Sequence, residues 1–216
     1  MMKITLLCSD TQHPVNAYIQ RWAEVQAGLH EVDIVQKKSQ LVGGEILFLI
    51  SCSEIINAND RAQYKVCLVL HASDLPKGRG WSPHIWALVQ GAEAITLSML
   101  EAEDKVDSGR IWRKAHITVP KHALWDEINH LLFTAEVDMI DYAVQNYAIV
   151  TPQAQTETDQ ATYHPKRTPK DSQIDPHKSI AEQFDLIRVS DPNRFPAYFE
   201  HLGQRYILKL EKYNEQ

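Results

Sequence analysis

Residues 65–83 read KVCLVLHASDLPKGRGWSP, an apolar run that passes directly into a loop rich in proline, glycine and charge. The run Lys65–Ala72 lacks polar alternation, which is typical of a strand buried on both faces of a parallel sheet. Prolines and glycines in the following loop give the backbone a fixed, unusual path, which is useful where main chain approaches a ligand. His71 ends the strand, and ligands of parallel sheets bind at the carboxyl ends of their strands.

Apolar runs and helical periodicities alternate on both sides of this stretch. Alternation of strands with helices predicts parallel pairing and right-handed crossovers. We therefore expect an α/β fold, Rossmann-like, with a mostly parallel central sheet flanked by helices. The expected strands are Lys3–Ser9, Glu31–Gln36, Glu45–Ser51, Lys65–Ala72, Ala94–Ala102 and Arg110–Val119, and the expected helices are Val15–Ala27, Ser53–Asn59, Pro83–Val89 with Ser82 as its N-cap, and Ala123–Tyr147.

The composition changes after the long helix, where residues 151–163 read TPQAQTETDQATY. Such a polar segment predicts a linker or loop at 150–163, between a principal domain at 1–149 and a C-terminal subdomain at 164–216. In the subdomain we expect a helix at Ser179–Val189 and a hairpin of Ala197–Leu202 and Arg205–Tyr213. This appendage is predicted to dock against the sheet or in a dimer contact.

Composition limits the classes of partner and compartment. The chain has 216 residues, 44% hydrophobic, with a formal net charge of -6 and no basic run, which disfavours a nucleic-acid partner. Cys8, Cys52 and Cys67 fit neither a zinc site nor a disulfide framework, so free thiols and no metal are expected. Without a signal peptide or an apolar run of membrane-spanning length, the sequence predicts a cytoplasmic protein with no membrane partner.

The loop and its flanks resemble the motif of folate-dependent formyltransferases, which runs His-x-Ser-x-Leu-Pro-x-x-x-Gly and continues to a proline and a helix. A second block, Ala94–Ile111, is similar to the strand and acidic Asp-Thr-Gly loop of the same family. The tail resembles that of sugar-nucleotide N-formyltransferases and methionyl-tRNA formyltransferases. The matching residues are His71, Ser73, Leu75, Pro76, Gly80, Pro83, Trp86, Ala87 and Gly91 in the first block, Asp107, Ser108, Gly109 and Ile111 in the second, and Lys166–Asp175, Ser179–Arg188 and Arg194–Ala197 in the tail.

The resemblance implies a formyltransferase fold and a reaction that moves the formyl group of 10-formyltetrahydrofolate to an amine. The expected acceptor is a small molecule, an amino sugar linked to UDP or dTDP, for surface-polysaccharide synthesis, and the expected assembly is a homodimer. His71 and Asp107 would be catalytic, because an imidazole can exchange the amine proton near neutral pH and a carboxylate can orient it. Without the resemblance, His71 reads as a stray histidine on a turn and Asp107 as a loop cap before Gly109.

Two groups of binding residues follow from the same resemblance. The folate would lie in the loops after the third strand and before Asp107. The acceptor would lie against the loop that follows His71, with Lys77, Arg79 and Arg167 as candidates for a diphosphate. The folate group is Ile50, Ser51, Cys52, Ser53, Ala102, Glu103, Asp104 and Lys105, and the acceptor group is Ser73, Lys77, Gly78, Arg79, Gly80, Trp81 and Arg167.

One position departs from the family pattern, since Val69 stands where the family usually has an asparagine that donates to the developing oxyanion. Losing one such donor can cost about two to three orders of magnitude in rate. A backbone N–H, a water, Lys77 or Arg79 would donate instead, or the enzyme is slow, or the protein binds without catalysing.

The last explanation keeps a non-catalytic folate- or nucleotide-binding protein as an alternative, beside a formyltetrahydrofolate hydrolase. A glycinamide ribonucleotide formyltransferase is disfavoured because 9–14, SDTQHP, contains no glycine.

Overall fold

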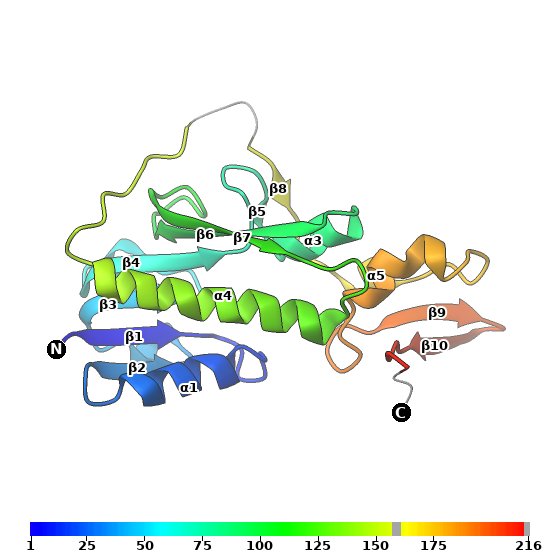
Figure 1. Ribbon diagram of the computed structural model, residues 1–216, viewed down its shortest axis with the longest axis horizontal. Helices are drawn as coiled ribbons and strands as arrows, with labels where there is room; N and C mark the ends of the chain where they lie inside the picture. Colours follow the sequence, from blue (N-terminus) through cyan, green and yellow to red (C-terminus); the bar gives the residue numbers. More distant parts are fainter. Residues whose placement is uncertain (157–160, 214–216) are drawn as a thin grey trace.

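The computed structural model describes residues 1–156 and 161–213. Its centre is a six-stranded sheet in the order β2-β1-β3-β4-β6-β7 (Figure 1). The first four pair in parallel, while β4–β6 and β6–β7 are antiparallel, so the expected α/β fold with a mostly parallel sheet is confirmed. The strands are β1 (Lys3–Leu7), β2 (Glu31–Val35), β3 (Gly44–Leu49), β4 (Tyr64–His71), β6 (Ala94–Glu101) and β7 (Ile111–Thr118).

The two faces of the sheet are covered unequally. A large apolar cluster joins one face to α1 (Asn16–Gln26), α3 (Pro83–Val89) and α4 (Trp125–Asn146), with the long α4 lying along the direction of the strands (Figure 1). A smaller cluster on the other face lies beneath α2 (Ala58–Arg61) and its neighbouring loop. Strands buried on both faces need continuous apolar runs, which explains the pattern of β3 and β4.

Local signals placed most boundaries to within a few residues, with two exceptions. The helix expected at Ser53–Asn59 is wrong, because Asn57 accepts from the backbone N–H groups of Asn59 and Asp60 and begins α2 there. Ser82 does precede α3, but it has φ 46° and makes no capping hydrogen bond through its side chain.

The tail packs against the end of the principal domain. The helix expected at Ser179–Val189 is shorter and divided, a 3₁₀ turn at Ala181–Gln183 followed by α5 (Phe184–Arg188). Val189 joins the main apolar cluster, and the buried Arg188 donates to the carbonyls of Pro120 and Ala123. The expected hairpin is present as β9 (Ala197–His201) and β10 (Gln204–Leu208), while residues 214–216 of the predicted subdomain lie outside the described residues.

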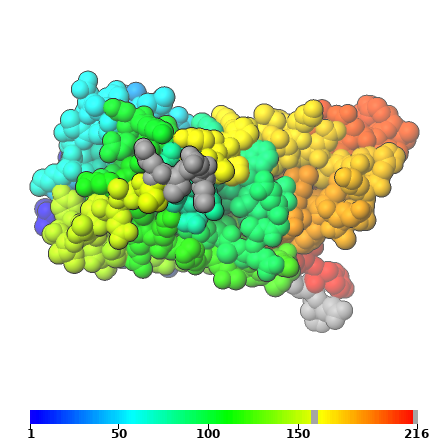
Figure 2. Space-filling view, turned by 90° about the horizontal axis from the view of Figure 1, so that it is seen from above, coloured from blue at the N-terminus to red at the C-terminus, as the bar shows by residue number. Residues whose placement is uncertain are grey.

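The described residues of the segment predicted as a linker pair with the edge strand β7 and with the loop after β4. Gln153 exchanges two backbone hydrogen bonds with Ile111, and β8 (Tyr163–His164) pairs in parallel with β5 (Arg79–Gly80). In Figure 2 this yellow part of the chain lies over the green surface of the neighbouring strands. Residues 157–160 of the predicted linker lie outside the described residues, and two further 3₁₀ turns occur at Lys38–Gln40 and Pro169–Ser172.

None of the helices in the described ranges combines the length and apolar character needed to cross a membrane.

Candidate active site

His71 and Asp107 meet at the carboxyl end of β4. His71 Nδ1 lies 3.6 Å from Asp107 Oδ1. The two residues are 7% and 9% exposed, so water screens their interaction poorly. β4 carries His71 opposite Ser98 of β6, and the loop after β6 returns the chain to Asp107. The structure therefore brings together the two residues that the sequence predicted as a catalytic pair.

The other nitrogen of His71 has a partner of its own. Nε2 lies 2.9 Å from the carbonyl oxygen of Gly78. A carbonyl oxygen can only accept a hydrogen bond, so Nε2 is the nitrogen that donates. Nδ1, at 3.6 Å from Asp107 Oδ1, lies just beyond hydrogen-bond distance of the carboxylate. The Gly78 carbonyl therefore fixes the orientation of the ring, with Nδ1 facing Asp107.

Asp107 is held by its backbone as well as by its carboxylate. It has φ 55°, a left-handed conformation that costs a non-glycine residue about 1–2 kcal/mol. Its Oδ2 accepts from the backbone N–H of Gly80 at 2.9 Å. Two residues later, a Cβ added to Gly109 would lie 1.9 Å from the carbonyl oxygen of Glu101, so only glycine fits at this position. The acidic loop is thus shaped to present one carboxylate to His71.

The loop 77–81 meets residues 153–156 and 161–164 beside this pair. Arg79 is 7% exposed, and its two Nη groups donate to Gln155 Oε1 at 2.7 Å and to the Tyr163 hydroxyl at 3.1 Å. The Gly78 N–H donates to the Thr162 hydroxyl at 2.8 Å. Arg79 also lowers the pKa of the Tyr163 hydroxyl through the hydrogen bond between them. Both Nη groups of Arg79 are therefore engaged within the protein, while its buried Nε has no partner among the described residues.

The residues predicted to bind folate lie on two loops, and they differ in how far their side chains are exposed to solvent. Ile50 is fully buried in the core, so its side chain is out of reach of a ligand. Ser51 and Ser53 are exposed and tied to Ser9, through its hydroxyl in both cases. Cys52 and Ala102 are half-buried against the smaller apolar cluster. Glu103, Asp104 and Lys105 are exposed, and Asp104 Oδ1 accepts from Arg61 at 2.6 Å.

Val69 lies between these two loops. It is half-buried and packs on the same small cluster as Cys52 and Ala102. Its apolar side chain offers no hydrogen-bond donor at the place where the family usually has one. What it does offer is a continuous apolar surface next to His71.

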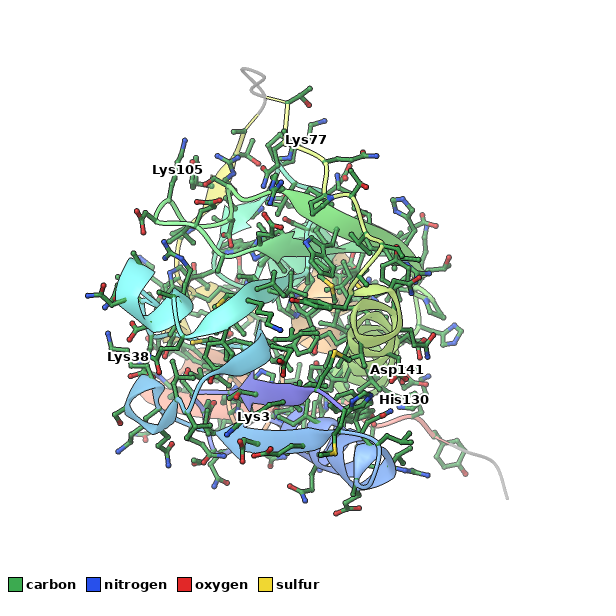
Figure 3. All side chains as sticks on the ribbon, turned by 90° about the vertical axis from the view of Figure 1, so that its left-hand side faces the viewer. Lys3, Lys38, Lys77, Lys105, His130 and Asp141 are labelled. Carbon is green, nitrogen blue, oxygen red and sulfur yellow. The ribbon has the colours of Figure 1, made fainter. Side chains whose placement is uncertain are left out.

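The remaining residues predicted for the acceptor are distributed around the mouth of the loop. Lys77 is exposed, and Figure 3 shows it with Lys105 at the same outer end of the molecule. Trp81 is 43% exposed, and Lys166 Nζ lies 4.8 Å from its ring centre. Ser73 is buried, and its hydroxyl has no partner among the described residues. Arg167 stacks over Trp86 and donates to the Asp171 carbonyl, and burial lowers its pKa.

Several residues of the site carried no signal in the sequence. Gln155 and Thr162 come from the segment that reads as a linker, and a polar residue in such a segment has no periodicity to mark it. His13 bonds the Ser51 hydroxyl through Nε2 at 3.2 Å, and burial lowers its pKa to about 4. Burial likewise lowers the pKa of His84 to about 4, and its Nδ1 has no partner among the described residues.

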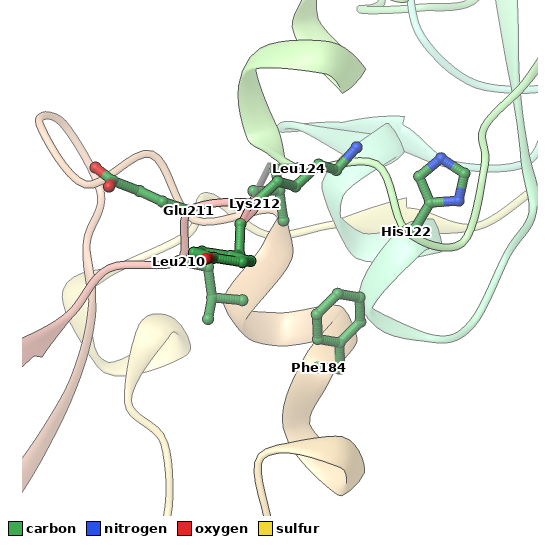
Figure 4. A pocket seen from close by; sticks show the side chains of 7 residues that line it. His122, Leu124, Phe184, Leu210, Glu211 and Lys212 are labelled. Carbon is green, nitrogen blue, oxygen red and sulfur yellow. The ribbon is translucent and has the colours of Figure 1, made fainter. Parts of the chain in front are cut away.

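Two hollows of the surface are lined by residues other than the His71–Asp107 pair. One of about 540 Å³ is formed by the tail and the start of α4 (Figure 4), with His122, Phe184 and Lys212 among its lining. Another of about 210 Å³ is lined by Cys67, Ala102 and Glu103, and so reaches two residues predicted for folate. Neither of these two hollows is lined by His71 or Asp107. Within the described residues, no cluster of three His, Cys, Asp or Glu side chains is arranged to hold a metal ion.

The thiols agree with the expectation of free cysteines. Cys8, Cys52 and Cys67 are unpaired, and burial raises the pKa of Cys8 to about 11 and of Cys67 to about 12. Such thiols are poor nucleophiles near neutral pH.

Comparison with known proteins also identifies a formyl transferase domain in the chain. A family model described as formyl transferase matches residues 5–144. A methionyl-tRNA formyltransferase from Thermodesulfovibrio yellowstonii is 28% identical over 149 residues, 67% of this chain and 47% of that protein. The chain thus spans about half the length of this curated relative.

Solved structures match the fold at lower identity. A methionyl-tRNA formyltransferase from Clostridium thermocellum superposes with a TM-score of 0.81 at 22% identity, covering 95% of this chain and 90% of that one. A 4-N formyltransferase from Francisella tularensis gives 0.73 at 15% identity, covering 99% of each chain. HypX from Aquifex aeolicus in complex with tetrahydrofolic acid gives 0.77 at 19% identity, covering 96% of this chain and 37% of that one.

Proposed function

The chain belongs to the formyl transferase family, and from that premise we propose that it moves the formyl group of 10-formyltetrahydrofolate to the amine of a nucleotide-linked amino sugar. The observation that carries the proposal is the buried contact between His71 and Asp107, with Nδ1 and Oδ1 3.6 Å apart. Formyl transfer to an amine needs a group that takes a proton from nitrogen and returns one to the leaving nitrogen. An imidazole with an adjacent carboxylate can do both.

In this proposal each residue has a separate part. His71 takes the proton that the amine loses as the new C–N bond forms. Asp107 orients the ring and stabilises its charged form. As the bond between the formyl carbon and the folate nitrogen breaks, the ring returns its proton to that nitrogen.

The folate fits the apolar side of the pair. Cys52, Val69 and Ala102 are half-buried and contiguous, which suits one face of a flat pterin ring. Exposed backbone at 51–53 and 102–105 can supply hydrogen bonds to the pterin edge. A hollow of about 210 Å³ already reaches Ala102 and Glu103.

A sugar acceptor agrees better than tRNA with the charge of the chain. The formal net charge is -6, whereas proteins that bind nucleic acid usually present a basic face. The exposed Trp81 and Lys77 beside the loop are suited to a base or sugar ring and to a phosphate. Synthesis of a surface-polysaccharide sugar in the cytoplasm, by a homodimer, completes the proposal.

A second candidate function rests on Val69. A protein that lacks the oxyanion donor would bind formyl folate without transferring the group, or pass it slowly to water. This candidate predicts folate binding with no dependence on an amine.

The test is incubation of the protein with 10-formyltetrahydrofolate and a panel of UDP- and dTDP-linked amino sugars. We expect one acceptor to gain the mass of a formyl group while tetrahydrofolate is released in equal amount. Release without any amine would replace the proposal by a hydrolase, and binding without release would replace it by a binding protein. Light scattering of the same sample checks the homodimer.

A further inference from the structure

The segment 153–164 contributes a side chain whose hydrogen bonds converge on the backbone of Asp107. Gln155 Nε2 donates to the carbonyl of Asp107 and to that of Gly109, each at 2.9 Å. Gln155 Oε1 accepts from Arg79 at 2.7 Å. Both donated hydrogens and the amide oxygen are therefore used, and exchanging the amide ends would break all three bonds.

These hydrogen bonds hold the backbone at Asp107 and Gly109, next to the strained conformation of Asp107. Asp107 has φ 55°, and left-handed non-glycine residues persist only where surrounding structure fixes them. The amide of Gln155 holds the carbonyls on either side of Ser108, so it fixes the direction in which the Asp107 side chain leaves the backbone. The Asp107 carboxylate then accepts a hydrogen bond from the backbone N–H of Gly80 at 2.9 Å and faces His71.

The same amide joins the two halves of the site. Arg79 precedes Gly80 in β5, which pairs with β8, and Gly78 in the same loop accepts from His71. Gln155 thus links the loop that touches the imidazole to the loop that carries the carboxylate. A single neutral side chain can hold these two loops in position without adding a charge next to His71 and Asp107.

We infer that Gln155 is a positioning residue for Asp107, holding its carboxylate in line with His71. The inference rests on the proposed function for its effect on turnover, but it also makes a structural claim that needs no activity. A misplacement of about 1 Å at a reacting group can lower a rate about a hundredfold.

The main variant is Gln155→Glu, which keeps the oxygen that meets Arg79 and loses both donated hydrogen bonds. We expect turnover to fall about tenfold to a hundredfold while KM for both substrates stays within about twofold. Gln153→Glu is the matched control, because it makes the same chemical change two residues earlier on an exposed side chain whose backbone pairs with Ile111. The control should keep wild-type turnover.

A merely structural role would lower turnover in any background, so the second measurement is a double-mutant cycle. With Asp107→Asn already present, Gln155→Glu should change turnover by less than about twofold, since the group it positions has been removed. An equal loss in both backgrounds would overturn the inference. If the glutamate variant does not fold, Gln155→Ala takes its place in the same cycle.

A crystal structure of the Gln155 variant separates this inference from the proposed function. We expect the gap between His71 Nδ1 and Asp107 Oδ1 to widen from 3.6 Å by at least about 1 Å. An unchanged gap would overturn the positioning role even where the enzyme is active. If the wild-type protein transfers no formyl group to any amine, the proposed function fails, and the gap alone decides the role of Gln155.

Discussion

The two sides of the His71–Asp107 pair are built from different interactions. On the acceptor side, the loop 77–81 and the segment 153–164 are joined by hydrogen bonds through Arg79, Gln155 and Thr162. On the folate side, Cys52, Val69 and Ala102 form an apolar surface shaped by packing. Hydrogen bonds fix direction, while apolar contact tolerates small shifts of position. If the proposed function holds, we therefore expect the acceptor side to set the geometry of the reaction and the folate side to supply affinity.

The largest effect is expected where the two sides meet. His71→Ala and Asp107→Ala should each lower turnover by at least about a hundredfold, because general acid–base catalysis contributes factors of about 10²–10⁴. Turnover is measured by tetrahydrofolate release, with circular dichroism as the check that the fold is kept. Near-normal turnover in either variant would refute the assigned roles.

On the acceptor side, Gly80→Ala should break the geometry. An added Cβ would lie 2.4 Å from the His164 carbonyl, so β8 must shift and the N–H that holds Asp107 shifts with it. We expect turnover to fall roughly thirtyfold.

Gly91→Ala is the control for Gly80→Ala, because the two glycines have φ +90° and +96° and no atom lies within 4 Å of the Cβ added at Gly91. Both variants should lose about 1 kcal/mol of stability from backbone strain, read from urea unfolding, and the Gly80 variant should lose more. Equal turnover in the two would show that the contact with β8 does not hold the site.

Substitutions on the folate side should change KM for the folate much more than they change turnover. Ala102→Phe fills the half-buried surface beside Cys52 and Val69, so we expect KM for the folate to rise about tenfold while turnover at saturation changes less than about threefold. Steady-state kinetics with the folate varied at saturating acceptor gives both numbers. A fall in turnover with unchanged KM would contradict the assignment of Ala102 to the folate-binding surface.

The smallest effect on turnover is expected from Glu136 of α4, which lies in the core away from the pair. Burial raises its pKa to about 8 from 4.5, and its Oε2 has no partner among the described residues. The folded state then holds a proton that the unfolded state releases, so this group stabilises the fold at pH below about 4.5 and loses that contribution as pH rises to about 8.

Glu136→Gln should remove this slope, so its stability gain over the wild type grows from pH 5 to pH 8 and reaches a few kcal/mol, measured by urea unfolding. Taking the difference between the two proteins cancels the opposite contribution of His13 and His84, whose pKa values burial lowers to about 4. A gain that does not vary with pH would show that Glu136 is charged in the folded protein.

The same contrast describes what the sequence could predict. The parallel strands, His71 at the end of β4 and the loop with Asp107 follow from apolar runs and from residues that repeat a family motif. The meeting of segments 79–80 and 163–164 does not, because it depends on pairing between residues far apart in the chain. Gln155 is one polar residue among many in a polar segment, and only the fold gives it partners. The sequence likewise offers Arg79 only as a candidate ligand of a diphosphate or an oxyanion, and its burial, to 7% exposure, follows from the fold alone.

Reading the turnover of His71→Ala, Asp107→Ala and the double variant together tests most directly whether the imidazole and the carboxylate work as one unit. We predict that the double variant is about as slow as the slower single variant, because removing either group disables the same proton transfer. Rate losses that multiply in the double variant would mean that the two groups act independently, and the catalytic pair proposed here would not exist.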